Sequence, residues 1–129
     1  MDKPAWEKFE IAVANFVKAL DSSARVTHDA KLPDIHSKTI RQRDVWVEAK
    51  VCQHFPVKIL ISCKRKKRIL NQQDIDAFNG ERISSGAQLG VIYSFSGFTN
   101  NALEKGKTLG ISCCMIFDNE PTNIPENIV

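Results

Sequence analysis

The first hydrophobic pattern in the chain has the period of a helix. Residues 4–20, PAWEKFEIAVANFVKAL, predict an amphipathic helix with Pro4 near its first turn. Glu10 lies on or beside the apolar stripe of this helix, which is an unusual position for a carboxylate. The stripe consists of Trp6, Phe9, Val13, Phe16, Val17 and Leu20.

The next segments alternate polar and apolar residues, as half-buried strands do. Residues 24–28, ARVTH, predict a short edge strand. Residues 43–51 and 57–64 predict two further strands, joined as an antiparallel hairpin around CQHFP. Residues 29–42 are polar, contain a proline and show no period, so they predict a loop.

Beyond this hairpin the chain alternates helices with strongly apolar strands. Asn71 and Thr99 are the expected N-caps of two helices, which end at Gly86 and Gly110. Because each helix connects two strands, the connections are parallel crossovers, and the fold class is α/β with a central mixed sheet flanked by helices. The order is αβββαβαβ, with the later elements at residues 71–86, 87–95, 99–110 and 111–117.

Length and composition fit one domain with its own core. The chain has 129 residues, of which 43% are hydrophobic and 26% charged, as in ordinary globular proteins. We expect a single domain over residues 1–117, followed by a polar tail or linker over residues 118–129. No apolar run approaches the roughly 20 residues of a membrane span. The charged N-terminus has no signal-peptide core, so cytoplasmic residence is expected.

The net charge of +3 is unevenly distributed. The last twelve residues carry three acids and no cation, so residues 1–117 hold 18 basic and 12 acidic side chains. This excess favours a polyanionic partner. Five cations follow one another at Lys64–Arg68, directly after a predicted strand; taken alone, such a run indicates a solvated loop.

The four cysteines do not have the spacing of a metal site. Cys52 and Cys63 stand alone, Cys113 and Cys114 are adjacent, and no CxxC motif occurs. We expect buried, reduced thiols, as is usual for free cysteines in a reducing cytoplasm.

Three polar residues at one end of the predicted hairpin are placed to form a site. Asp44 begins one strand and Lys64 ends its antiparallel neighbour, so both lie at the same end of the pair. Ser62 shares a face with Lys64, because side chains alternate along a strand. This pattern is typical of metal-dependent nucleases, which combine an acid with a polar residue two positions before a lysine and with that lysine. In such a site oxygen ligands hold a magnesium ion that polarises phosphate and activates water, and the lysine stabilises negative charge.

These residues resemble the motifs of the PD-(D/E)xK nuclease superfamily, and in particular of the Mrr-like restriction endonuclease domains. The resemblance spans about residues 5–117 and implies a restriction-endonuclease-like fold. It is carried by FE at residues 9–10, RQRDV at 41–45, ISCKRKK at 61–67 and LGVIYSFSGFTNNALEKGKTLGI at 89–111.

The resemblance implies a role for each residue that matches a motif. Asp44 corresponds to the metal-binding aspartate and Lys64 to the catalytic lysine. Glu10 corresponds to an acid that some members place near the metal; the alternative is a boundary residue whose carboxylate reaches water. Ser62 departs from the family, which usually has Glu, Asp or Gln there, and a neutral hydroxyl weakens the affinity for Mg²⁺ or Mn²⁺. A literal PD at residues 33–34 lies in the predicted loop, so Asp44, which leads into a strand, is the preferred aspartate.

The function implied is a magnesium- or manganese-dependent endonuclease that hydrolyses double-stranded DNA in restriction–modification or defence. Such nucleases often cut as dimers, so a homodimer is compatible with it, as is an additional specificity domain or partner chain. For Gln72, plain exposure at the start of its helix is the alternative to a role in binding. The residues expected to contact nucleic acid are Arg65, Lys66, Lys67, Arg68 and Gln72.

Ser62 also supports a function of a different class. A nuclease-fold module that has lost the usual acid binds or senses nucleic acid without cutting it. A third alternative, a purely structural partner domain, predicts neither binding nor cleavage.

Overall fold

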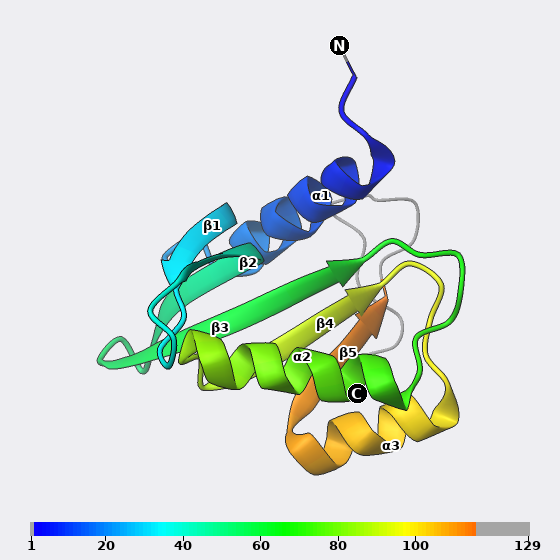
Figure 1. Cartoon of the computed structure of the whole chain (residues 1–129). Helices are drawn as coiled ribbons and strands as arrows, with labels where there is room; N and C mark the ends of the chain where they lie inside the picture. The colour runs from blue at the N-terminus through cyan, green and yellow to red at the C-terminus, as the bar shows by residue number, and fades with distance from the viewer. Residues whose placement is uncertain (1, 116–129) are drawn as a thin grey trace.

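The computed structural model describes residues 2–115, which form three helices and five strands (Figure 1). Their order, αβββαβαβ, confirms the predicted order. The predicted tail and the end of the last predicted strand, from residue 116 on, lie outside the described residues. The elements are α1 (Ala5–Leu20), β1 (Arg25–Pro33), β2 (Ile40–Val51), β3 (Phe55–Lys64), α2 (Gln72–Ser85), β4 (Leu89–Ser94), α3 (Asn100–Leu109) and β5 (Ile111–Met115).

The five strands form one mixed sheet in the order β1-β2-β3-β4-β5. The first three strands pair antiparallel, whereas β3, β4 and β5 pair parallel because α2 and α3 connect them. Both the α/β class and the mixed sheet are as predicted. Within residues 2–115, no helix combines the length and the hydrophobicity needed to cross a membrane.

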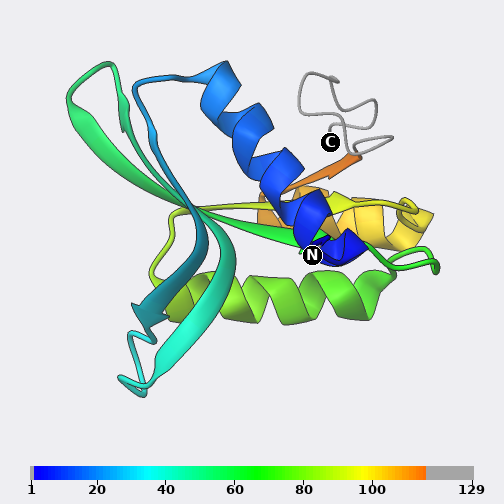
Figure 2. The same cartoon turned by 90° about the horizontal axis from the view of Figure 1, so that it is seen from above.

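Helices cover both faces of the sheet (Figure 2). On one face, Phe9 of α1 packs in a core with Val45 of β2. On the other face, Phe78 of α2 packs in a second core with Trp46 of β2 and Leu60 of β3. Consecutive strand residues therefore alternate between the core under α1 and the core under α2 and α3.

The predicted loop over residues 29–42 is wrong for most of its length. β1 continues to Pro33 and β2 already begins at Ile40, and the two strands pair up to these ends. Ala30 and Leu32 pack in the core under α2 and α3, so apolar and polar residues do alternate here. The alternation includes only these two apolar side chains, which is too few to predict a strand. Proline is compatible with this strand because β1 lies at the edge of the sheet.

The remaining turn, residues 34–39, is ordered by its first residue. Oδ1 of Asp34 accepts a hydrogen bond from the N–H of His36 at 2.8 Å, which is the local bonding typical of an aspartate-led turn. The N–H of Ile35 donates to the carbonyl of Ser84 at 2.8 Å. The β1–β2 hairpin is therefore attached to the C-terminal end of α2.

β1 and β2 change direction where Asp29 lies opposite Asp44. Asp29 has a left-handed φ of 56°, and the regular pairing skips these two residues but continues on both sides. Before this point Val26 packs in the α1 core, whereas after it Ala30 packs in the α2 core. The kink curves the end of the hairpin toward α2 (Figure 2) and leaves Asp44 outside the backbone ladder.

α2 and α3 begin and end where the sequence predicts. The side chain of Asn71 accepts a hydrogen bond from the N–H of Asp74, and Gly86 ends α2 with a left-handed φ of 80°. Thr99 and Gly110 have the same functions in α3.

Three predictions of burial were wrong, all at the ends of elements. Trp6 and Leu20 are 52% and 68% exposed because they lie in the first and last turns of α1. Cys52 is exposed because it lies in the β2–β3 turn, although all four cysteines are free, as expected, and the other three are buried.

Candidate active site

A small cleft of about 70 Å³ lies between β2, β3 and α2. It brings together Asp44, Ser62 and Lys64, as the hairpin geometry predicts. This volume holds several water molecules, and therefore also a hydrated ion. The lining consists of Gln42, Arg43, Asp44, Leu60, Ile61, Ser62, Lys64 and Glu81.

Asp44 is oriented toward β3 by a backbone hydrogen bond. Its Oδ2 accepts from the N–H of Cys63 at 2.8 Å, just beyond the last regular pair of β2 and β3. A bond to an ionised acceptor is stronger than a neutral one, so it fixes the carboxylate. The second oxygen, Oδ1, has no hydrogen-bond partner among residues 2–115. Asp44 therefore lines the cleft with a carboxylate that is held by one oxygen and has its other oxygen free of hydrogen bonds within the described residues.

The thiol of Cys63 does not add a nucleophile to this arrangement. Burial raises its pKa well above the ordinary value, and the negative charges of Asp44 and Glu10 raise it further. The thiol stays protonated at neutral pH and is unreactive.

Ser62 and Lys64 lie two residues apart on the α2 side of β3. Ser62 is 4% exposed, and its hydroxyl has no hydrogen-bond partner within the described part of the chain. Lys64 is half-buried, and its ammonium forms no ion pair with any residue from 2 to 115. An unpaired cation and a neutral hydroxyl thus face the same space as Asp44.

Two charged residues of the cleft were not predicted from the sequence, namely Arg43 and Glu81. Glu81 follows the buried residues Ile75 and Phe78 at intervals of three, so it continues the sheet-facing stripe of α2. That spacing is a signal that was present in the sequence. Arg43 is next to Asp44, and simple strand alternation places neighbours on opposite faces; only the kink brings both to one cleft.

Glu10 lies on α1 and does not line the cleft. Its Oε1 accepts a hydrogen bond from Nε2 of His28 at 2.9 Å. Burial raises the pKa of Glu10 above its ordinary value and the negative charge of Asp44 adds to the rise, although the hydrogen bond from His28 opposes it. Asp44 and Glu10 therefore interact electrostatically, and the metal-binding role of Glu10 stays a prediction.

The basic segment, Lys64–Arg68, is anchored by its two arginines. The guanidinium carbon of Arg65 lies 4.3 Å from the ring centre of Phe95, within the range of a cation–π contact. Arg68 donates two hydrogen bonds to the carboxylate of Asp74, at 2.7 and 2.8 Å. Asp74 also belongs to the N-terminal cap of α2, so this pair attaches the segment to the helix.

The other predicted nucleic-acid contacts are exposed. Lys66 and Lys67 form no ion pair within the described residues, although the carbonyl of Lys66 accepts a hydrogen bond from Ser96. Gln72 lies in the first turn of α2, beside a shallow hollow toward the start of α3. Contact of these residues with DNA stays a prediction.

The Arg68–Asp74 pair predicts a pH-dependent contribution to stability. The hydrogen bonds from Arg68 lower the pKa of Asp74 to about 2 from 3.8. A lowered pKa means that the pair stabilises the fold above pH 3.8 and that this stabilisation is lost as the pH falls through about 2. Asp74→Asn should therefore reduce the urea midpoint at neutral pH, by a small amount because Arg68 is half exposed.

The difference between wild type and Asp74→Asn should disappear near pH 2, as measured by urea denaturation across this range. Glu104→Gln, which removes one exposed carboxylate that forms no ion pair within residues 2–115, is the matched control. An equal destabilisation by Asp74→Asn at neutral pH and near pH 2 would show that the ion pair is not its source.

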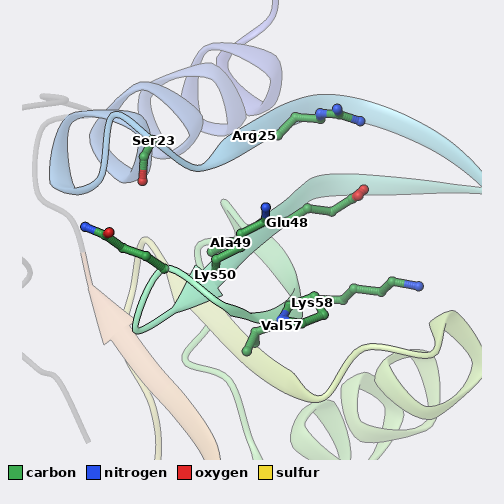
Figure 3. A pocket seen from close by; sticks show the side chains of 9 residues that line it. Ser23, Arg25, Glu48, Ala49, Lys50, Val57 and Lys58 are labelled. Carbon is green, nitrogen blue, oxygen red and sulfur yellow. The ribbon is translucent and has the colours of Figure 1, made fainter.

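A larger hollow, of about 570 Å³, lies at the other end of β1, β2 and β3 (Figure 3). Its charged residues include Arg25, Glu48, Lys50 and Lys58, from three neighbouring strands. A single carboxylate among three cations is unsuited to hold a divalent cation. The small cleft, which contains Asp44, is therefore the better candidate for metal-assisted chemistry.

Asp34, the alternative aspartate, lies in the turn between β1 and β2 and does not line the cleft. Hydrogen bonds from the backbone of Ser37 and His36 lower the pKa of its carboxyl. These contacts explain its burial by a structural role in the turn.

Comparison with known proteins identifies a family and a shared fold. The family Mrr_cat, described as restriction endonuclease, matches residues 1–112. The crystal structure of AF1548, a protein of unknown function, superposes with a TM-score of 0.64 and 12% identity, over 84% of this chain and 58% of that one. The MspJI restriction endonuclease in complex with a 27-mer oligonucleotide superposes with a TM-score of 0.55 and 15% identity, over 90% of this chain and 26% of that one.

No curated protein matches the sequence. The chain spans about a quarter of MspJI and somewhat more than half of AF1548, and at these identities the two structures show the shared fold alone. The family match, in contrast, covers most of the chain. It includes the four candidate site residues Glu10, Asp44, Ser62 and Lys64. The chain therefore belongs to the Mrr_cat restriction endonuclease family.

Proposed function

We propose that this domain is a metal-dependent endonuclease that hydrolyses phosphodiester bonds of double-stranded DNA. The observation that carries the proposal is the meeting of Asp44, Ser62 and Lys64 in one cleft, with the Asp44 carboxylate oriented by the backbone of β3. Membership of a restriction endonuclease family supports hydrolysis. The similar fold of MspJI, whose structure is a complex with an oligonucleotide, supports DNA as the substrate.

The oxygen atoms of the cleft suit Mg²⁺ or Mn²⁺, which are hard ions that prefer oxygen ligands. Asp44 would supply a carboxylate oxygen and Ser62 a neutral one, and Glu10 is the further acid that the family resemblance indicates. Within residues 2–115, no three side chains of His, Cys, Asp or Glu form a metal-binding group. When bound, the ion would polarise the phosphate and lower the pKa of the attacking water.

Lys64 contributes through its position and charge. Its ammonium, unpaired among the described residues, belongs to the same cleft lining as Asp44, where the phosphate would approach. A cation held there stabilises the additional negative charge of the transition state, and in a half-buried site this interaction is stronger than in water. Lys64 also orients the attacking water by donating a hydrogen bond.

The test is the nicking of supercoiled plasmid in Mg²⁺ or Mn²⁺, with and without chelator. We expect cleavage that requires the metal. A wild-type protein that binds DNA in a salt-sensitive way but never cuts it would instead support the second candidate function, a binding or sensing module. Ser62 favours that candidate, because a neutral residue occupies the position where the family usually has an acid or glutamine.

The two free lysines of the basic segment should strengthen binding without selecting a sequence. Replacing Lys66 and Lys67 together with alanine should weaken the binding of any duplex by a similar factor. Each lost phosphate contact lowers the slope of log affinity against log salt by about 0.9, so the slope should fall by about 2. Fluorescence anisotropy at several salt concentrations measures both quantities.

Lys8 and Lys107 provide the matched control, since they are exposed lysines on α1 and α3. Replacing both with alanine removes the same charge and should leave the salt slope almost unchanged. If the two double variants lose the same slope, the effect is one of net charge, and the basic segment is not a contact surface.

The proposed enzyme would act in the cytoplasm, in restriction or defence. Cutting both strands with one site per subunit requires two copies, so we propose a homodimer on DNA. Since the chain spans only 26% of MspJI, sequence selection would come from a further domain or partner chain.

A further inference from the structure

Two opposite charges face the small cleft without neutralising each other. Glu81 of α2 and Arg43 of β2 both line it, yet neither forms an ion pair with any residue from 2 to 115. Arg43 is only 4% exposed, and its buried Nε has no hydrogen-bond partner within the described part of the chain. A buried guanidinium nitrogen without a partner is unfavourable unless water or a ligand satisfies it. This side chain gives the cleft a positive charge that suits an anion such as a phosphate.

From this arrangement we propose that Glu81 is the second acidic metal ligand of the site, in place of the acid that is missing at Ser62. The inference rests on the proposed metal-dependent function. Glu81 belongs to the sheet-facing stripe of α2, which carries it to the same cleft as Asp44 and the Ser62 hydroxyl. Two carboxylates and one hydroxyl from three different elements form a set of hard oxygen donors.

Glu81 is better placed for this role than Glu10. The carboxylate of Glu10 lies outside the cleft lining and is engaged by Nε2 of His28. Glu81 lines the cleft, and its helical neighbour Arg82 is occupied by Asn79 instead. The second acid of the site thus comes from the helix after β3, and Arg43 remains available for the phosphate.

The test is the direct titration of Mn²⁺ into the protein by calorimetry, without DNA. Glu81→Gln should weaken Mn²⁺ binding by about tenfold or more, since affinity depends on the number of charged ligands. Glu104→Gln, an identical change on an exposed part of α3, should leave the affinity within about twofold. Circular dichroism checks that both variants keep the wild-type melting temperature.

A rescue experiment separates a ligand from a structural residue. Ser62→Glu in the Glu81→Gln background returns a carboxylate to the cleft, so Mn²⁺ affinity should recover to within about threefold of wild type. Glu81→Asp keeps the charge on a shorter side chain and should give an intermediate loss, which covers the case in which Glu81→Gln fails to fold.

The outcomes distinguish this inference from the proposed function. If Asp44→Asn loses Mn²⁺ while Glu81→Gln binds it like wild type, the metal site stands and the role of Glu81 is wrong. If Glu81→Gln reduces DNA cleavage but not Mn²⁺ affinity, Glu81 is not a ligand. If the wild type binds no Mn²⁺ at all, both the inference and the metal-dependent function fall.

Discussion

Lys64→Met should reduce the rate of DNA cleavage by about 100- to 1,000-fold, the range seen when one preorganised charge-stabilising group is removed. Methionine keeps much of the aliphatic stem and the half-buried packing, but removes the ammonium of a residue that lines the same cleft as Asp44. DNA affinity should change much less, because Lys66 and Lys67 remain. Single-turnover cleavage of a labelled duplex at saturating protein measures the rate separately from binding.

Lys58→Met is the matched control for this substitution. Lys58 lies on the same strand but at the opposite end, in the lining of the larger hollow. Its replacement should leave the cleavage rate within about twofold of wild type, against the 100-fold or greater loss for Lys64. A cleavage rate for Lys64→Met within a few-fold of wild type would remove Lys64 from the mechanism.

Asp44→Asn should abolish measurable Mn²⁺ binding and lower the cleavage rate by roughly 100- to 10,000-fold. The estimate follows from the several kcal/mol that a bound metal contributes to the transition state. The amide oxygen of asparagine still accepts the hydrogen bond from the N–H of Cys63, so the strand pairing should persist. The variant therefore removes the charge and keeps the local structure, which unchanged thermal unfolding would verify.

Asp29→Asn tests whether any acid near the kink has the same effect. Asp29 lies opposite Asp44 on β1, is exposed, and has a left-handed φ of 56° that asparagine also adopts readily. Its replacement should leave both Mn²⁺ binding and cleavage near wild type. Equal losses for the two variants would mean that the acidic end of the strands acts only through its overall charge.

Much of the fold was predictable because local signals and tertiary packing agree. The caps at Asn71 and Thr99 and the terminal glycines mark both later helices, and the apolar strands between them require crossover connections. β2 begins at Ile40 and not at Asp44 as predicted, but its pairing with β3 ends at Val45 and Ile61, so Asp44 and Lys64 still lie at the same end of the paired region. These features depend on few residues that are close in the chain.

The rest of the β1–β2 hairpin and two residues of the cleft could not be predicted, because they depend on tertiary contacts and not on the alternation of side chains along a strand. The last residues of β1 and the start of β2 were predicted as a loop because few of their side chains face the core, and because contacts with α2 complete their pairing. The kink at Asp29 then changes which side chains face the cleft. Strict alternation places Arg43 on the opposite face from Asp44, so it could not predict Arg43 in the cleft. The spacing of Glu81 after Phe78 predicts that it faces the sheet. Its closeness to β2 and β3 depends on how α2 packs against the sheet, which the spacing alone does not give.

The tight turn between β2 and β3 acts on the cleft from the far end of both strands. Cys52 and Gln53 have left-handed φ values of 55° and 58°, and the N–H of His54 donates to the carbonyl of Val51 at 3.1 Å. Removing one residue from this turn would slide β3 by a single position, so Lys64 would emerge beneath α1 instead of α2. A deletion of one turn residue could thus inactivate the protein although all of its proposed catalytic residues are still present.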